Sequence, residues 1–261
     1  MRIEVLLNTE AVAKRAAAFL AEKAREAIAA RGLFVMALSG GKTPWIMLRA
    51  LADEALPWEK IHVVQVDERV APAGHPDRNL THLRESLLER AALREDQIHP
   101  MPVEPADLEA AAIRYARGLR AIAGTPPVLD LVHLGLGSDG HTASLVPGDP
   151  VLQVVDRDVA VTEAYQGRPR MTLTYPLLNR SREILWIVTG AEKAPMLKRL
   201  LEGDASIPAG GIRRDSALVL ADRAAAGEEN PDSSRKGGKG VLTEGCATGM
   251  EGCDGSQAEG S

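Results

Sequence analysis

The sequence of 261 residues is 45% hydrophobic and 26% charged, which is ordinary for a globular protein and leaves enough apolar surface for a buried core. Its 31 basic and 36 acidic side chains give a formal net charge of −5, which argues against a nucleic-acid-binding surface. No apolar run approaches the roughly 18 residues of a membrane-spanning helix, and the N-terminus lacks the apolar segment of a signal peptide. The chain is therefore expected in the cytoplasm, with neither nucleic acid nor a membrane as a partner.

The composition changes near residue 227. Residues 227–261 contain nine of the 24 glycines and both cysteines, and their net charge of −4 leaves −1 for residues 1–226. With almost no large apolar groups, such a segment buries too little surface to offset the entropy of ordering. Residues 1–226 are therefore predicted to form a single domain, and residues 227–261 a disordered tail. Cys246 and Cys253 lack further ligands at metal-site spacing and are interpreted as incidental thiols.

The predicted elements of residues 1–226 alternate between helices and strands. A long amphipathic helix is expected first, over residues 10–31, with Gly32 as its stop signal. Short apolar runs predict buried strands at 33–38, 61–66, 129–134, 159–162, 184–188 and 217–220. Helical patterns separate most of them, at 44–55, 79–88, 108–122 and 191–202. Continuous apolar strands interleaved with helices favour an α/β domain with a mostly parallel sheet covered on both faces.

Ligands of such sheets bind beyond the carboxyl ends of the strands, so the polar segments there are candidate sites. The first spans residues 39–43, with Ser39, Gly40, Gly41 and Thr43 as candidate substrate contacts. Glycines let backbone N–H groups approach an anion, and the following helix contributes the positive end of its dipole. The segment is interpreted as a phosphate-binding loop, with a plain glycine-rich turn as the alternative.

The second candidate is the charged segment Asp67-Glu68-Arg69, which follows the predicted strand at 61–66. Arg69 could pair with a phosphate, and Asp67 could accept hydrogen bonds from sugar hydroxyls. The alternative is a solvent-exposed strand end with an internal ion pair.

The third candidate is the glycine-rich segment 134–148, which contains Gly137 as a candidate substrate contact, Asp139 and His141. Imidazole titrates near neutral pH, and the backbone amides of a glycine turn could stabilise an oxyanion, so His141 is interpreted as a general base. Asp139 precedes it by two residues, and this spacing leaves open whether the two side chains touch. The other histidines are expected to be surface or packing residues: His62, His75, His82, His99 and His133.

Five motifs, taken in this order, resemble the 6-phosphogluconolactonase family. They are Ser-Gly-Gly-x-Thr-Pro at 39–44, Asp-Glu-Arg at 67–69, Leu-Gly-x-Gly-x-Asp-Gly-His-Thr-Ala-Ser-Leu-x-Pro-Gly at 134–148, Arg-Met-Thr-Leu-Thr at 170–174 and Gly-Ala-Glu-Lys at 190–193. The resemblance implies a Rossmann-like, three-layer α/β/α fold, similar to that of glucosamine-6-phosphate deaminase and ribose-5-phosphate isomerase. It also implies hydrolysis of 6-phospho-D-glucono-1,5-lactone to 6-phospho-D-gluconate in the oxidative pentose phosphate pathway, without a metal or organic cofactor.

The resemblance assigns roles to residues position by position. His141 matches the family's proposed base, which deprotonates a water molecule as it attacks the lactone carbonyl, and Asp139 is grouped with it. Arg170 and Lys193 match positions that face the substrate phosphate, and Arg69 matches a substrate-positioning cation. Alternatively, Arg170 caps a strand and Lys193 simply lies in the first turn of a helix. A cation there opposes the helix dipole, which favours the anion-binding interpretation of Lys193.

Two features depart from the family pattern, and two other functions are weighed. Arg78 stands where the family often has serine before asparagine, which puts a substrate contact there in doubt, and the tail at 227–261 matches nothing in the family. A glucosamine-6-phosphate deaminase has Phe-Asn-Glu where this chain has Ser144, Leu145 and Val146, and a valine cannot support the histidine. A sugar-phosphate sensor of a transcription regulator would need a helix-turn-helix for which the N-terminus leaves no room. The oligomeric state is not predicted.

Overall fold

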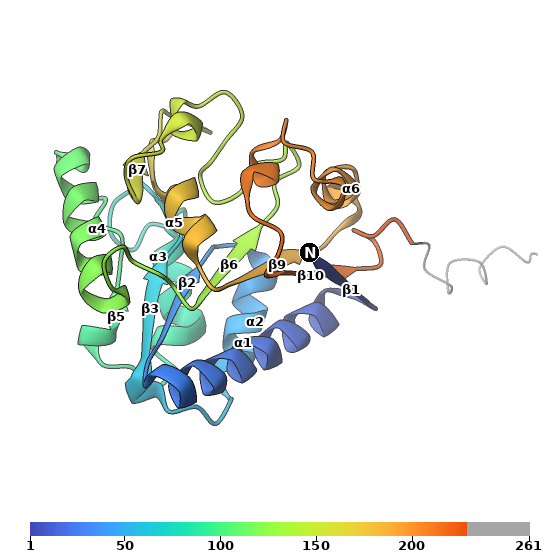
Figure 1. The fold of residues 1–261 in the computed structure, drawn as a ribbon, viewed down its shortest axis with the longest axis horizontal. Helices are drawn as coiled ribbons and strands as arrows, with labels where there is room; N and C mark the ends of the chain where they lie inside the picture. The colour runs from blue at the N-terminus through green and yellow to red at the C-terminus, as the bar shows by residue number, and fades with distance from the viewer. Residues whose placement is uncertain (229–261) are drawn as a thin grey trace, which may run out of the picture. The chain divides into compact units, whose positions relative to one another are not determined.

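Seven parallel strands form the central sheet of the chain, whose computed structural model describes residues 1–228 (Figure 1). Their order is β1-β10-β9-β6-β2-β3-β5. The bounds are β1 Arg2–Leu6, β2 Phe34–Leu38, β3 Ile61–Gln65, β5 Ile98–His99, β6 Leu131–Gly135, β9 Glu183–Val188 and β10 Ala217–Asp222. All five residues of β2 are buried, as a continuous apolar run predicts for a strand covered on both faces. The predicted parallel sheet is confirmed.

Six α-helices accompany the sheet in the described part of the chain: α1 Thr9–Arg31, α2 Lys42–Ala52, α3 Asn79–Leu83, α4 Leu108–Ala123, α5 Tyr175–Arg180 and α6 Ala194–Glu202. The long predicted helix is α1. The side chain of Asn8 accepts a hydrogen bond from the backbone N–H of Ala11 at its start. Gly32 ends the helix in the left-handed conformation, with φ 78°, as its stop signal predicts.

Two hydrophobic cores lie on opposite faces of the sheet, because successive residues of a strand point to opposite sides. Phe34 and Met36 of β2 pack into the core that includes the apolar faces of α1 and α2. Val35 and Ala37 of the same strand pack into the core that includes buried residues of α4, α5 and α6. Helices therefore cover both faces, and the arrangement is the predicted three-layer α/β/α domain (Figure 1).

A second, smaller sheet was not predicted. It consists of three antiparallel strands in the order β4-β8-β7, with bounds β4 Asp67–Arg69, β7 Val159–Val161 and β8 Arg170–Leu173. The assignment of residues 159–162 to the parallel sheet is therefore wrong, because an apolar run reveals burial but not the strand it pairs with. β4 and β8 lack a strand signal because they are short and begin with charged residues that face the site.

Some helix bounds also differ from the prediction. The predicted helix at 79–88 is α3 followed by a π-helical turn over Arg84–Leu88, and the one at 191–202 opens with a 3-10 turn over Ala191–Lys193 before α6. None of the helices in residues 1–228 is long and apolar enough to cross a bilayer. Residues 229–261, which include Cys246 and Cys253, lie outside the described residues, so the division into a domain at 1–226 and a disordered tail at 227–261 stays a prediction.

Candidate active site

A pocket of about 600 Å³ opens beyond the carboxyl ends of β2, β6 and β9 and beside β4. β9, β6 and β2 are neighbours in the centre of the sheet. The chain adds β3 and β5 on one side of β2, and β6, β9 and β10 on the other side. Such a topological switch point typically forms a ligand-binding cleft. Ten residues predicted from the sequence line it: Ser39, Gly40, Gly41, Thr43, Asp67, Arg69, Gly137, His141, Arg170 and Lys193. Asp139, the remaining predicted residue, does not line the pocket and contacts His141 instead.

The glycine loop after β2 forms one wall of the pocket. Gly41 precedes α2 with φ 134°, and no side chain of the described residues caps the helix there. The first N–H groups of α2 are therefore available to an anion, whose charge the positive end of the helix dipole favours. Gly40 must be small, because a Cβ at this position would lie 2.1 Å from Oδ1 of Asn79. This geometry suits a phosphate-binding loop.

His133 supports the loop through a hydrogen bond to its first residue. The sequence predicts only a surface or packing role for this histidine. This imidazole is fully buried on β6, and its Nδ1 accepts a hydrogen bond from the backbone N–H of Ser39, with 3.3 Å between the two nitrogens. Burial lowers the pKa of His133 to about 3, so its imidazole is neutral at physiological pH. His133 therefore supports the first residue of the loop without adding a charge.

His141 and Asp139 form a close pair, which answers the question that their spacing leaves open. Nδ1 of His141 lies 2.5 Å from Oδ1 of Asp139, and the backbone N–H of His141 donates to the same oxygen at 3.1 Å. Gly137 makes room for this pair, because a Cβ there would lie 2.1 Å from Nδ1 of His141. A carboxylate can only accept, so the shared proton belongs on Nδ1 and Nε2 keeps its lone pair. His141 thus has the geometry of a general base.

The hydrogen-bond donors around the Asp139 carboxylate favour its ionised form. Partial burial raises the pKa of this carboxyl, but the backbone and ring of His141, together with the hydroxyl of Tyr165, outweigh burial and lower the pKa overall. Asp139 is therefore ionised at neutral pH, where it can stabilise an imidazolium at His141.

The three cations predicted from the sequence line the pocket from different elements. Arg69 is on β4, Arg170 begins β8, and Lys193 directly precedes α6. None of the three forms an ion pair with a carboxylate of the described residues, so their charges are available to a ligand. Burial lowers the pKa of the Arg170 guanidinium, but an arginine side chain remains charged in proteins.

Asp67 is a buried acid on the floor of the same pocket. Its Oδ2 accepts a 2.6 Å hydrogen bond from the hydroxyl of Ser144, and the side-chain amide of Asn79 donates to its backbone carbonyl at 3.1 Å. Burial raises its pKa, although the Ser144 hydrogen bond and the charge of Arg170 oppose this shift. A carboxylate that lines the pocket in this way can accept hydrogen bonds from the hydroxyl groups of a ligand.

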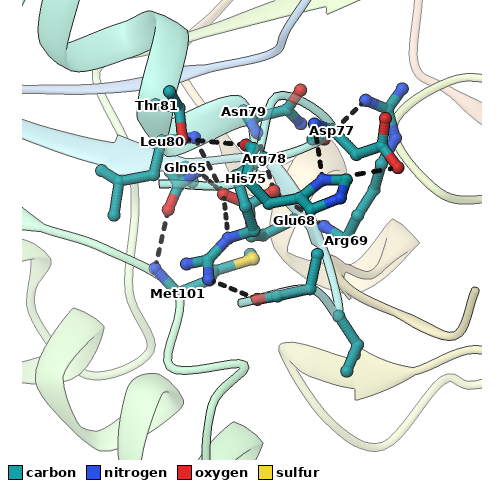
Figure 2. Close-up of polar contacts among 12 residues, drawn as sticks. Gln65, Glu68, Arg69, His75, Asp77, Arg78, Asn79, Leu80, Thr81 and Met101 are labelled. Carbon is teal, nitrogen blue, oxygen red and sulfur yellow. Dashed lines mark hydrogen bonds and ion pairs between the residues drawn. The ribbon is translucent and has the colours of Figure 1, made fainter. Parts of the chain in front are cut away.

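Arg78, which departs from the family pattern, belongs to a polar cluster that includes Arg69 and Asn79, two lining residues of the pocket (Figure 2). Its Nε lies 3.1 Å from Oε2 of Glu68, and both side chains are almost fully buried. The Glu68 carboxylate also accepts the backbone N–H groups of Arg69, Asn79 and Leu80, each at 2.8 Å. Figure 2 shows how Glu68 thereby joins β4 to the start of α3. Arg78 does not line the pocket; it secures the backbone that presents Arg69 and Asn79.

Some residues of the pocket were not predicted from the sequence: Lys42, Asn79, Thr189 and Glu192. Lys42 occupies the variable position of the glycine motif, and Asn79 was noted only as the neighbour of Arg78. Thr189 follows the predicted strand at 184–188, so a search of every strand end would have found it. Its hydroxyl is hydrogen-bonded to that of Thr43 at 2.7 Å.

Comparisons with known proteins agree with this architecture. The family model of glucosamine-6-phosphate isomerases/6-phosphogluconolactonase matches residues 7–220. A 6-phosphogluconolactonase from a Synechocystis species is 41% identical over 225 residues, which cover 84% of this chain and 93% of that protein. The crystal structure of a 6-phosphogluconolactonase from Thermotoga maritima is 28% identical and has a TM-score of 0.76, with 85% of this chain and 98% of that chain covered.

The fold is also shared with a different enzyme. A monomeric glucosamine-6-phosphate deaminase of known structure is 21% identical and has a TM-score of 0.77, covering 88% of this chain and all of its own. At this identity the likeness concerns the fold alone, and it confirms the predicted similarity to the deaminase architecture. Together with the family model and the relatives at 41% and 37% identity, these findings show that the chain belongs to the glucosamine-6-phosphate isomerase/6-phosphogluconolactonase family.

Proposed function

We propose that the chain hydrolyses 6-phospho-D-glucono-1,5-lactone to 6-phospho-D-gluconate, the lactonase step of the oxidative pentose phosphate pathway, with His141 as general base. The names of the relatives support the reaction, and the 2.5 Å contact between His141 and Asp139 beside a cationic pocket carries the assignment of the base. A sugar-phosphate lactone is the small-molecule partner in this proposal, and the cytoplasm is the compartment that we expect for it.

The residues suit the steps of a lactone hydrolysis. Nε2 of His141 takes a proton from a water molecule as that water attacks the lactone carbonyl, and Asp139 stabilises the resulting imidazolium. Collapse of the tetrahedral intermediate breaks the bond to the ring oxygen, which takes the proton from the His141 imidazolium and becomes the hydroxyl of the product. Meanwhile, the phosphate of about −1.5 to −2 charges is held by pocket cations and the N–H groups of the glycine loop.

The deaminase alternative is disfavoured by the segment after His141. The hydroxyl of Ser144 donates a hydrogen bond to Asp67, and the apolar side chains of Leu145 and Val146 are buried. No carboxylate of this segment is available to support the histidine as the deaminase glutamate would. A sugar-phosphate sensor is the second alternative. Such a protein would bind the ligand without hydrolysing it, so His141 would contribute to it only as a binding contact.

The test is the release of 6-phosphogluconate from freshly generated lactone, corrected for spontaneous hydrolysis. We expect His141→Ala to lower kcat by roughly 10²–10⁴-fold, the usual share of a general base, with the fold unchanged by circular dichroism. His82→Ala is the matched control, because this imidazole lies outside the pocket. Unchanged catalysis by His141→Ala would exclude the base, whereas ammonia release from glucosamine 6-phosphate would favour the deaminase.

A further inference from the structure

Tyr165 lies at the edge of the site, on a tight turn that joins β7 to β8. Its backbone N–H donates to the carbonyl of Arg168 at 3.0 Å, and the two residues between them, Gln166 and Gly167, have φ of 53° and 80°. Two positive φ values in succession define the turn that closes two-residue β-hairpins, and glutamine adopts such a φ only at a cost. The Gln166 side chain accepts a hydrogen bond from Arg170 at 3.2 Å, which stabilises this conformation.

From this turn, the Tyr165 side chain contacts three members of the candidate site. Its hydroxyl donates to Oδ2 of Asp139 at 2.9 Å, and its ring meets the imidazole of His141 edge-on, with 5.6 Å between the ring centres. The guanidinium carbon of Arg170 lies 4.9 Å from the centre of the same ring. One side chain therefore joins the proposed base, the acid beside it and a binding cation.

The hydrogen bond from Tyr165 adds a third contact to the Asp139 carboxylate, beside the ring and the backbone N–H of His141. About a third of the Asp139 side chain is exposed, so water competes with His141 for its two oxygens. The Tyr165 hydroxyl occupies Oδ2 and leaves Oδ1 directed at His141. Burial and the neighbouring carboxylate raise the pKa of Tyr165, which keeps its hydroxyl protonated and able to donate.

We propose that Tyr165 is a positioning residue of this site: its hydroxyl holds Asp139 against His141, and its ring supports the guanidinium of Arg170. The role in turnover rests on the proposed lactone hydrolysis. The two parts of the side chain have separate tasks, so their removal has separate consequences. Loss of the hydroxyl affects the chemical step, whereas loss of the ring also affects substrate binding through Arg170.

The kinetic test compares Tyr165→Phe with Tyr165→Leu. We expect Tyr165→Phe to lower kcat by about 10-fold with KM unchanged, because a hydrogen bond to a charged group is lost. Tyr165→Leu is expected to lower kcat equally and to raise KM by about 5-fold, since a cation–π contact is lost as well. Tyr175→Phe is the matched control: it removes a hydroxyl that donates to the carbonyl of Pro208, outside the pocket.

A double-mutant cycle separates positioning from a general structural role. If Tyr165 acts through Asp139, Tyr165→Phe has no further effect on kcat in an Asp139→Asn background. Equal effects of Tyr165→Phe in both backgrounds, or a kcat that matches the wild type, would overturn the proposal.

A measurement without substrate keeps this proposal distinct from the proposed reaction. In protein with ¹⁵N-labelled histidine, we expect the His141 ring to carry its proton on Nδ1 in the wild type and to populate both tautomers in Tyr165→Phe. An unchanged tautomer in Tyr165→Phe would overturn the positioning of Asp139 by this hydroxyl. Absence of lactone hydrolysis by the wild type would instead reject the proposed function. The NMR result would still show whether the Tyr165 hydroxyl positions Asp139 against His141.

Discussion

Arg69 and Arg170 lie directly opposite each other in the antiparallel pairing of β4 with β8. Like charges at opposed positions of a sheet destabilise it, and the Arg69 charge adds to the burial that lowers the pKa of Arg170. The buried carboxylate of Asp67 opposes part of this repulsion. The remaining positive charge faces the pocket, so an anionic ligand there would relieve this repulsion.

The arginine pair predicts a specific effect on binding. We expect Arg170→Gln to raise KM for the lactone by roughly 10-fold or more, because a charge-assisted contact of about 1.5–3 kcal/mol is lost. If the contact is to the remote phosphate, kcat changes little. Inorganic phosphate should raise the Tm of the wild type more than that of Arg170→Gln. Arg25→Gln is the control, since Arg25 lies outside the pocket and pairs with Glu54. Equal KM values for Arg170→Gln and Arg25→Gln would contradict the prediction.

A methyl group at position 137 should disable the proposed base. In Gly137→Ala the new Cβ would lie 2.1 Å from Nδ1 of His141 and 2.5 Å from Oδ1 of Asp139, so the imidazole must move away from its partner. We expect kcat to fall by about 10²-fold, within the share of a general base, with the fold intact.

Gly118→Ala is the matched control for this change. Gly118 lies in α4, outside the pocket, and a Cβ there meets no atom within 4 Å. This substitution should leave kcat unchanged and stabilise the protein by about 0.5–1 kcal/mol, because alanine restricts the unfolded chain. Wild-type kcat in Gly137→Ala would show that the pair tolerates a shift and would contradict the first expectation.

The sequence predicts five of the seven strands of the parallel sheet and most of its helices, because apolar runs and apolar periodicity are local; β1 and β5 were not predicted. It also predicts the site loops, because the carboxyl ends of parallel strands meet at one edge. Pairing partners are not local information, so residues 159–162 were assigned to the wrong sheet. For the same reason nothing in the sequence marks Tyr165, whose contact with Asp139 joins residues 26 positions apart. Arg78 shows the same limit: the sequence only puts a substrate contact there in doubt, and its burial against Glu68 depends on a pairing that the sequence does not reveal.

The buried pair of Glu68 and Arg78 predicts a large effect on stability. Arg78→Ala leaves the Glu68 carboxylate buried without its ion-pair partner, and we expect a loss of about 3–5 kcal/mol in the free energy of unfolding. Glu104, the other acid bonded to Arg78, is half exposed, so Glu104→Gln should cost less than about 1 kcal/mol. Urea unfolding measures both. Similar losses in the free energy of unfolding for the two variants would contradict the prediction, because the buried ion pair with Glu68 would then contribute no more than the exposed one with Glu104.

The buried imidazole of His133 predicts how stability depends on pH. Its pKa falls from 6.5 to about 3 on folding, so between these values the unfolded chain binds a proton that the folded chain does not. Stability contributed by the neutral form is therefore complete above pH 6.5 and is lost as the pH falls toward 3, by at most about 1.4 kcal/mol per pH unit.

His133→Asn removes this titration while keeping an acceptor near the backbone N–H of Ser39. The free energy of unfolding of the wild type should fall relative to that of His133→Asn by about 2 kcal/mol between about pH 7.5 and pH 5. His82→Asn is the control, because that imidazole lies partly exposed at the surface and should not produce such a difference. Parallel pH profiles of the wild type and His133→Asn would mean that His133 gains its proton without unfolding, through access of water to the base of the glycine loop.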